Sequence, residues 1–202
     1  MPVLQETQIA SLLAPYLNPI PHAVLSHLTI YLDLLVRWNT RTNLTAVRAP
    51  EEMVQRHFGE SLFAAQHLGD LPPETVLDLG SGAGFPGVPI ALMYPSIPVT
   101  LAESQNKKAT FLREIVRTLG LRNVEVWAGR AEALPLDRMF HTVALRAVDN
   151  MEGALAAAAL RASRQIVLLA TVTPVIPTEF VISDITPLPC SENGLVLRAV
   201  RR

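Results

Sequence analysis

The fold of this chain is decided by the stretch VLDLGSGAGFPG, which runs from Val76 to Gly87. It opens as an apolar run carrying one acid, Asp78, and breaks into glycines at positions 80, 82, 84 and 87 before apolar residues resume at 88–93. This order predicts a buried strand, a tight turn and the start of a helix. Glycine is needed where the backbone takes a positive φ or lies against a ligand. So many glycines in one turn predict that a ligand sits on it.

Two classes of ligand fit the turn. Residues 82–87 satisfy the pattern G-x-G-x-x-G, which binds the pyrophosphate of a dinucleotide at the start of a helix. Asp78 extends the pattern to D-x-G-x-G-x-G, and a carboxylate there can accept hydrogen bonds from an ammonium group but adds negative charge beside a pyrophosphate. The extended pattern resembles the first motif of class I methyltransferases, whose cofactor S-adenosylmethionine is a cationic nucleoside without phosphate. We favour this interpretation over a nicotinamide-dependent oxidoreductase.

The composition indicates one globular unit. The chain has 202 residues, of which 50% are hydrophobic, enough for one sizeable core plus a small appendage. The net charge of −1 means that any nucleic-acid contact must come from a local patch. The single cysteine, Cys190, excludes an internal disulfide and argues against a cysteine-based metal cluster. Neither a signal peptide nor an apolar run of ~18 residues is present, so we expect a cytoplasmic protein with no membrane segment and no metal.

The chain before the turn has helical patterns. An apolar stripe recurs at helical spacing from Val24 to Trp38, and Pro50 followed by two acids is typical of another helix start. We therefore expect an N-terminal helical cap over residues 1–70 and a ligand-binding domain over residues 71–202, together forming one compact unit.

Strand and helix patterns alternate in the remainder of the chain. The predicted strands are 75–79, 98–102, 124–128, 142–146 and 165–171. The predicted helices are 86–94, 106–119 and 150–162, with a loop or weak helix over 130–138. This alternation predicts an α/β fold with a doubly wound, mostly parallel sheet. Ligands of such sheets bind beyond the carboxyl ends of the strands, where the strand order reverses.

Further candidate residues stand at the ends of these strands. Glu103 closes the second strand, where a carboxylate can accept both ribose hydroxyls of a nucleoside. Ala131 and Glu132 follow the third strand, where a backbone amide and an acid can read an adenine ring. Arg146 ends the fourth strand and either lines the site or contacts Asp149 or Glu132, because an unpaired arginine is rarely part of a core.

Several phrases elsewhere in the chain carry a family resemblance. They are Arg37-Trp38-Asn39, Asn43-Leu44-Thr45-Ala46-Val47-Arg48, Glu51-Glu52-Met53, Arg56-His57-Phe58, the turn from Leu79 to Pro89, and Phe111-Leu112-Arg113. Together they resemble the glucose-inhibited division protein B family, bacterial methyltransferases that modify guanine N7 in small-subunit ribosomal RNA. The resemblance covers approximately residues 25–150 and implies a Rossmann-like class I methyltransferase fold.

The resemblance also implies where ligands bind. In this family S-adenosylmethionine is held at positions matching Gly80, Phe85, Glu103, Ala131, Glu132 and Arg146, to which the glycine-rich motif adds Asp78, Gly82 and Gly84. The family's target is a guanine in the decoding-region loop of 16S ribosomal RNA, so the implied partner is that RNA or the small ribosomal subunit. We expect RNA contacts from Arg48, Arg56, His57, Lys107, Lys108 and Arg113, and we expect a monomer.

The expected chemistry needs few catalytic groups. Guanine N7 carries a lone pair and no proton, so methyl transfer requires no general base, and we nominate no catalytic acid or base. Phe85, Trp38 and Phe58 are candidates for stacking on the target base. His57 has two interpretations, a contact with RNA or the cofactor rim, and a histidine packed between helices.

The end of the chain departs from the family pattern. A Lys-Gly pair is common after the fifth strand, whereas this chain reads LATVTP over residues 169–174. Prolines at 174, 177, 187 and 189 forbid a long helix in the following segment. Glu60 and Glu103 also stand where the family usually has Asp. The altered tail keeps a second class open, a non-catalytic RNA-binding or ribosome-assembly protein that retains the fold.

Overall fold

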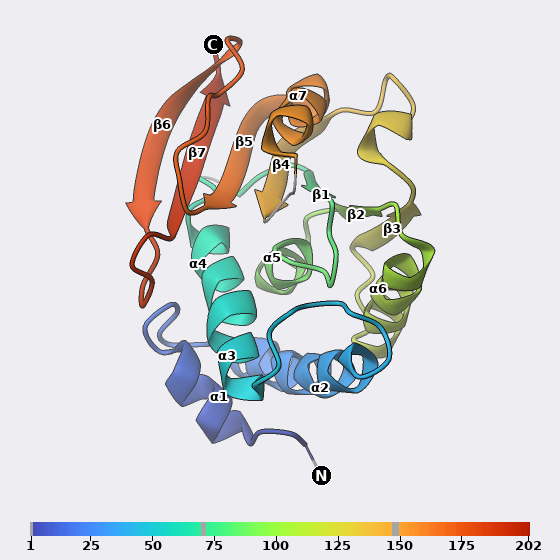
Figure 1. Ribbon diagram of the computed structural model, residues 1–202, viewed down its shortest axis with the longest axis vertical. Coiled ribbons are helices and arrows are strands. Elements are labelled where there is room, and N and C mark those ends of the chain that lie inside the picture. Colours follow the sequence, from blue (N-terminus) through green and yellow to red (C-terminus); the bar gives the residue numbers. More distant parts are fainter. Residues whose placement is uncertain (1, 70–71, 147–149) are drawn as a thin grey trace.

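The computed structural model describes residues 2–69, 72–146 and 150–202, and their strands form a single seven-stranded sheet (Figure 1). The strands are β1 (Val76–Leu79), β2 (Val99–Glu103), β3 (Val124–Ala128), β4 (Phe140–Arg146), β5 (Ala162–Ala170), β6 (Phe180–Pro187) and β7 (Leu195–Arg201). Their order in the sheet is β3-β2-β1-β4-β5-β7-β6. The five predicted strands and the doubly wound, mostly parallel architecture are confirmed, whereas β6 and β7 were not predicted.

The order in which successive strands are added to the sheet reverses at β1. This strand pairs in parallel with β2 on one side and with β4 on the other, so that Asp78 stands opposite both Leu101 and Ala144. All four residues of β1 are buried, because helices cover both faces of the sheet. The residues that follow β1, β2 and β4 therefore meet at one edge of the sheet, where ligands of doubly wound folds bind.

The last two strands form an antiparallel hairpin. β7 pairs antiparallel with β5 and with β6, which places β6 at the edge of the sheet. Residues 171–179, between β5 and β6, contain no helix, so the predicted loss of a helix in this proline-rich segment is confirmed. The chain crosses from β5 to β6 as an irregular segment instead.

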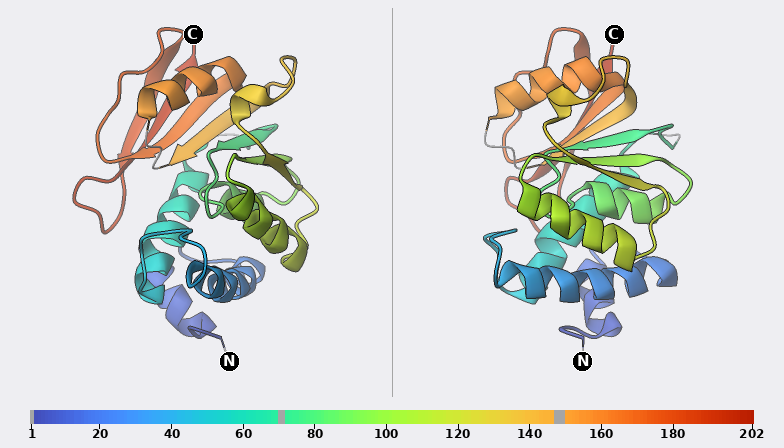
Figure 2. Two further views of the ribbon diagram at one scale, coloured as in Figure 1. Left: turned by 45° about the vertical axis from the view of Figure 1, so that its right-hand side comes forward. Right: turned by 90° about the vertical axis from the view of Figure 1, so that its right-hand side faces the viewer.

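The helices form two unequal layers. They are α1 (Glu6–Leu13), α2 (His22–Asn39), α3 (Pro50–Met53), the π-helix η1 (Val54–Gly59), α4 (Glu60–Gln66), α5 (Gly87–Met93), α6 (Asn106–Thr118), the 3-10 helix η2 (Ala131–Ala133) and α7 (Met151–Arg161). Figure 2 shows α7 on one side of the strands and α2, α5 and α6 on the other. The helix predicted from Pro50 onward is present but includes a π-helical turn that the sequence pattern did not reveal.

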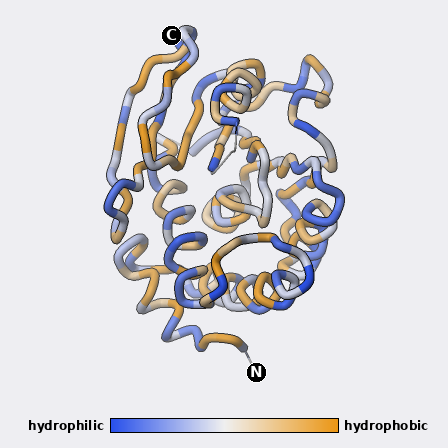
Figure 3. Tube along the Cα trace, viewed as in Figure 1, coloured by the Kyte–Doolittle hydropathy of each residue, from blue (hydrophilic) through white to orange (hydrophobic). Residues whose placement is uncertain are grey.

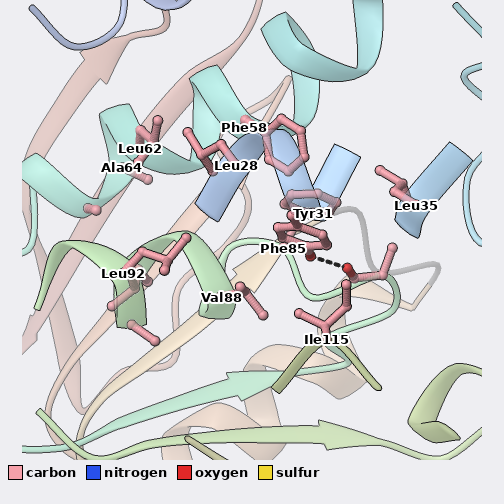
Figure 4. Close-up of a cluster of buried hydrophobic side chains, with 14 of the residues drawn as sticks. Leu28, Tyr31, Leu35, Phe58, Leu62, Ala64, Phe85, Val88, Leu92 and Ile115 are labelled. Atoms are coloured by element: carbon pink, nitrogen blue, oxygen red, sulfur yellow. Dashed lines mark hydrogen bonds between the residues drawn. The ribbon is translucent and has the colours of Figure 1, made fainter. Parts of the chain in front are cut away.

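The N-terminal helices share a core with the sheet. Tyr31 of α2 stacks on Phe85 of the glycine-rich turn, with ring centroids 5.3 Å apart, and Phe58 of η1 packs against both rings (Figure 4). The Tyr31 hydroxyl donates a hydrogen bond to the backbone carbonyl of Ala83, so α2 directly holds the turn. Burying each such ring contributes about 1.5–3 kcal/mol. We retain the division at residue 70 as a proposal, because residues 70 and 71 lie outside the described residues.

Helix α6 shows how the sequence pattern produces these layers. Phe111, Leu112 and Ile115 are buried against the sheet, while Lys107 and Arg113 are exposed. Figure 3 shows the resulting alternation of hydrophilic and hydrophobic residues along this helix. Among the described residues, no helix is both long and apolar enough to span a membrane.

Candidate active site

The glycine-rich turn contains two kinds of glycine. Gly80, Gly82 and Gly84 have φ values of +74°, +57° and +95°. Residues other than glycine rarely adopt these positive values, because their Cβ atom would clash with the backbone. A Cβ built on Gly80 would meet no atom within 4 Å, and one on Gly82 only the Gly80 carbonyl oxygen at 3.8 Å. A Cβ on Gly84 would lie 2.5 Å from the Tyr31 hydroxyl, and one on Gly87 2.6 Å from Asp78 Oδ2. Gly80 and Gly82 therefore border open space, whereas Gly84, also predicted to bind the cofactor, faces the packed helices.

Asp78 lies behind the turn and not on its open side. The carboxyl group is fully buried, and its Oδ2 accepts a hydrogen bond of 3.0 Å from the Gly87 amide at the start of α5. The other oxygen, Oδ1, has no hydrogen-bond partner among the described residues. Burial raises the pKa of Asp78 to about 7. A buried carboxylate oxygen without a donor costs about 1–3 kcal/mol, so a cationic donor reaching Oδ1 would be stabilising.

Glu103 lies beside the open part of the turn. The register of β1 and β2 sets Leu79 opposite Ala102, so Glu103 follows at the level of Gly80. Its Oε2 accepts a hydrogen bond from the Gly82 amide at 2.9 Å and its Oε1 one from the Gln105 amide at 2.7 Å. These bonds fix the carboxylate in one orientation. Each oxygen keeps a second lone pair, so the group can still accept two ribose hydroxyls.

The loop after β3 is held from the opposite side of the sheet. Ala131 is buried and Glu132 is exposed, both within η2. Arg161, at the end of α7 and only 4% exposed, donates hydrogen bonds to the backbone carbonyls of Glu132, Leu134 and Pro135. Arg161 thus positions the segment predicted to contact adenine. This role could not be predicted from the sequence, because an arginine in the last turn of a helix is usually solvated.

Arg146 points into the helical cap. Its Nη2 donates to Glu60 Oε2 at 2.8 Å and to the Arg56 carbonyl at 2.5 Å, and its Nη1 lies 3.1 Å from His57 Nδ1. The predicted contact with Glu132 is wrong, because the acid that pairs with Arg146 is Glu60, and Asp149 lies outside the described residues. Both side chains are largely buried, at 12% and 15% exposure. Burial lowers the pKa of Arg146 and raises that of Glu60, and each partner opposes the shift of the other.

The π-helix η1 makes this arrangement possible. In an α-helix the Glu60 amide would bond to the Arg56 carbonyl, four residues earlier. Here the Glu60 amide bonds to the carbonyls of Gln55 and His57 instead, and Arg146 donates to the Arg56 carbonyl. π-helical turns of this kind are frequent at functional sites. Gly59 within the turn also allows the Tyr16 ring to approach, since a Cβ there would lie 2.6 Å from it.

His57 is neutral and fully engaged. Arg146 has only donors, so Nδ1 of His57 accepts, and Nε2 carries the proton that it donates to Thr45 Oγ1 at 2.7 Å. The imidazole ring also stacks on Phe85 at 5.1 Å. Burial, and then the charge of Arg146, lower the pKa of His57 to about 3. With both ring nitrogens used inside the protein, the geometry favours the packing interpretation over the predicted RNA contact.

Two of the three aromatic residues considered for base stacking are covered, whereas Trp38 is only partly buried. Phe85 is 7% exposed and lies between the rings of Tyr31 and His57, and Phe58 is fully buried. Trp38 donates from Nε1 to Glu114 at 3.0 Å and packs its ring against Phe111. The expectation that Phe85 or Phe58 offers a free face to a base is therefore wrong.

The predicted RNA-binding cations are spread along the edge of the site. Lys107 and Lys108 occupy the first turn of α6, directly after Glu103, and Arg113 is exposed further along this helix. On the cap, Arg48 hydrogen-bonds the Asn39 carbonyl and the Asn43 side chain, and Arg56 pairs with Glu52 at 3.0 Å. The two groups lie on different elements: the first follows β2 along the chain, and in the second only Arg56 is linked to β4, through the contact of its carbonyl with Arg146. The described residues include no cluster of acids, histidines and cysteine arranged for a metal ion.

The strand order, the glycine-rich turn after β1 and the acid ending β2 define the class I methyltransferase fold. The chain superposes on magnesium protoporphyrin IX methyltransferase from Synechocystis PCC 6803 with a TM-score of 0.61 at 16% identity, covering 84% of this chain and 93% of that one. A SAM-dependent methyltransferase from Aquifex aeolicus gives a TM-score of 0.58 at 15% identity, over 75% and 93% of the two chains. These likenesses concern the fold alone.

The sequence itself places the chain in one family. The profile described as GidB, rRNA small subunit methyltransferase G, matches residues 24–171, and the chain belongs to this family. Ribosomal RNA small subunit methyltransferase G of Xanthomonas euvesicatoria pv. vesicatoria is 39% identical over 181 residues, 85% of this chain and 84% of that protein. The protein of the same name from Xylella fastidiosa strain M23 is 50% identical over 126 residues, which are 62% of this chain. That match spans 58% of the Xylella protein. The family resemblance inferred from the sequence is confirmed.

Proposed function

We propose that this protein transfers a methyl group from S-adenosylmethionine to N7 of a guanine in the decoding-region loop of 16S ribosomal RNA. Family membership supports this function. The observation that carries it is the open space over Gly80 and Gly82 with the oriented carboxylate of Glu103 beside it. This arrangement stands where the strand order reverses, next to Arg146 at the end of β4.

The residues present suit the proposed cofactor. Glu103 would hold the ribose, the backbone of Gly80 and Gly82 would lie against the nucleoside, and η2 would border the adenine. The unsatisfied Oδ1 of Asp78 suits the cationic amino-acid end of the cofactor, directly or through water. When bound, the cofactor would supply an electrophilic methyl carbon for N7, with sulfur as the leaving group keeping the electrons of the carbon–sulfur bond and the guanine ring taking up the positive charge.

The protein's contribution is alignment. Because N7 attacks without losing a proton, no side chain must remove one, and holding N7 in line with the methyl carbon can supply an effective molarity of roughly 10⁵–10⁸ M. The guanine ring becomes cationic, so an unpaired cation beside it would be unfavourable. The positive charge of Arg146 is balanced by Glu60, whose Oε2 lies 2.8 Å from Arg146 Nη2, so this pair adds no net charge next to the reacting ring.

The proposed RNA contacts come from cations along the same edge. Lys107, Lys108 and Arg113 on α6, with Arg48 and Arg56 on the cap, would neutralise phosphates around the target loop, since such contacts position an RNA without reading its sequence. We propose that the protein acts in the cytoplasm as a monomer, on this RNA or on the small ribosomal subunit.

The proposal is tested by methyl transfer from labelled S-adenosylmethionine to small subunits lacking the modification, followed by mapping of the labelled nucleotide. Incorporation at N7 of one guanine is expected. Absence of incorporation, with the cofactor bound normally in a calorimetric titration, would reject the activity. An assembly protein would instead keep its RNA affinity in a Gly82→Val variant and need not bind the cofactor. An oxidoreductase would bind a reduced nicotinamide cofactor in a fluorescence titration.

A further inference from the structure

A cavity of about 750 Å³ lies beyond the carboxyl ends of β4 and β5. Its inner wall is formed by Glu60 and Arg146, with Gln55 of η1 beside them. Thr171 and Val172, which follow β5, and Asn193, in the loop joining β6 and β7, close the opposite side. Its volume falls within the ~300–1,000 Å³ typical of small-ligand pockets. The unpredicted β6–β7 hairpin thus supplies part of the wall.

The cavity adjoins the proposed cofactor position. β1 and β4 are neighbours in register, with Leu79 opposite Leu145, so Gly80 and Arg146 come next at the same level. Gly80 borders the open space of the turn, and Arg146 lines the cavity. Neighbouring strands lie about 5 Å apart, so a methyl group held over Gly80 would be one strand spacing from the wall of the cavity at Arg146.

Glu60 offers the cavity a partly satisfied carboxylate. Its Oε2 accepts a hydrogen bond from Arg146, and the hydrogen bonds of the described residues include none to its Oε1. The Arg146 bond fixes the orientation of the group, and the π-helical turn before it fixes its position. Leu169, Val172 and Met151 provide apolar surface elsewhere in the cavity.

We propose that this cavity receives the target guanine and that Glu60 recognises its Watson–Crick edge. This inference rests on the proposed function. Guanine presents two adjacent donors on that edge, N1–H and the 2-amino group, which a carboxylate accepts together. Adenine presents an acceptor at N1 and is rejected, because its lone pair would face the carboxylate. With this edge at Glu60, N7 lies on the far side of the base.

Occlusion of the cavity gives the first test. Val172→Trp places a large ring in the cavity lining at a position that is 72% exposed, so the fold tolerates it, and narrows the cavity. The matched control is Val175→Trp, three residues away and 93% exposed, which lines a different groove. We expect Val172→Trp to lower methyl transfer at least tenfold with the cofactor Kd within twofold, and Val175→Trp to retain wild-type transfer. Equal transfer by the two variants would overturn the proposal.

Base recognition gives the second test. Small subunits are assembled with guanosine or inosine at the methylated position, since inosine lacks only the 2-amino group. The wild type should prefer guanosine about tenfold in kcat/KM, as expected for one lost hydrogen bond to a charged acceptor. Glu60→Gln should reduce that preference to twofold or less. If Glu60 only positioned Arg146, the variant would slow both substrates alike and keep the preference, which would overturn the assignment.

The two tests separate this inference from the function on which it rests. Failure of the wild type to methylate the guanosine substrate would refute the proposed function itself. Normal methylation by the wild type, with no loss in Val172→Trp and an unchanged base preference in Glu60→Gln, would refute only the cavity assignment. Glu179→Gln, an exposed acid away from the cavity, serves as the matched control for Glu60→Gln.

Discussion

Asp78 should make the protein without its cofactor less stable as the pH rises. Burial raises the pKa of Asp78 from 3.8 to about 7, so the folded state holds a proton that the unfolded state releases. The unfolding free energy then falls as pH increases between these two values and levels off above about 7. Each pKa unit corresponds to about 1.4 kcal/mol, so about 3 kcal/mol is lost between pH 5 and pH 8.

The Asp78→Asn variant removes this dependence. Asparagine keeps an oxygen that can accept the Gly87 amide but carries no charge at any pH. The stability difference between variant and wild type should therefore shift by about 3 kcal/mol in favour of the variant between pH 5 and pH 8. His57, whose pKa is lowered to about 3, makes the folded state less stable at acid pH, but it does so equally in both proteins.

The measurement is urea unfolding at pH 5 and pH 8, followed by circular dichroism. Asp137→Asn, at an exposed position, serves as the control and should stay within about 0.5 kcal/mol of the wild type at both values. The difference in unfolding free energy between Asp78→Asn and the wild type is compared at the two pH values. If it changes by less than about 1 kcal/mol, the assignment of a buried, mostly protonated carboxyl group is refuted. In the same variant, S-adenosylmethionine should bind more weakly at pH 8, because its ammonium group loses a charged acceptor.

Two further expectations concern the turn and the cations. Gly84→Ala should destabilise the fold by more than 2 kcal/mol, on the order of an overpacked core, because its Cβ would lie 2.5 Å from the Tyr31 hydroxyl. Gly80→Ala should cost only about 1 kcal/mol of backbone strain yet abolish cofactor binding, and a calorimetric titration that found normal binding would contradict the role given to Gly80. Replacing Lys107 and Lys108 by alanine should lower the slope of log affinity for RNA against log salt by up to about 1.4, whereas Arg164→Ala, an exposed position near the amino end of β5, should leave it unchanged. Cofactor affinity should be unaffected by the double substitution.

The sequence was most informative where a local pattern determines local structure. The run before Gly80 and the glycines after it predicted a strand, a turn and a helix start, and β1 and α5 stand there. The apolar runs that predicted β2 and β4 were likewise confirmed, since central parallel strands are continuous apolar segments. The predicted β3 is also present, as a partly buried strand at the edge of the sheet. The acid at the end of β2 was placed correctly because the strand end itself fixes its position.

The hairpin at the end of the chain was missed for a physical reason. Pro187 and Pro189 were interpreted only as excluding a long helix, and a strand was not considered, yet β6 is an edge strand, where a proline without an amide hydrogen is tolerated. The alternation of apolar and polar residues in 195–201 was the available signal. Because the hairpin was overlooked, its contribution to the cavity beside Arg146 was overlooked with it.

Partners brought together by folding could not be predicted. Arg146 pairs with Glu60, 86 residues earlier, and no spacing rule connects the two. The π-helical turn was equally hidden, because residues 54–59 have ordinary helical composition and differ only in which carbonyl each amide selects. The role of Arg161 could not be predicted either, since its acceptors are backbone carbonyls, which leave no mark in the sequence.

The wide turn of η1 also governs how this segment can change in evolution. A π-helical turn contains one residue more than an α-helical turn, so deleting a single residue between Val54 and Gly59 would leave a regular α-helix from α3 into α4. An amide of that helix would then take the Arg56 carbonyl, and Arg146 would lose this acceptor beside Glu60. The number of residues in this helix is therefore as constrained as their identity, and insertions or deletions should be tolerated far less here than in the connecting loops.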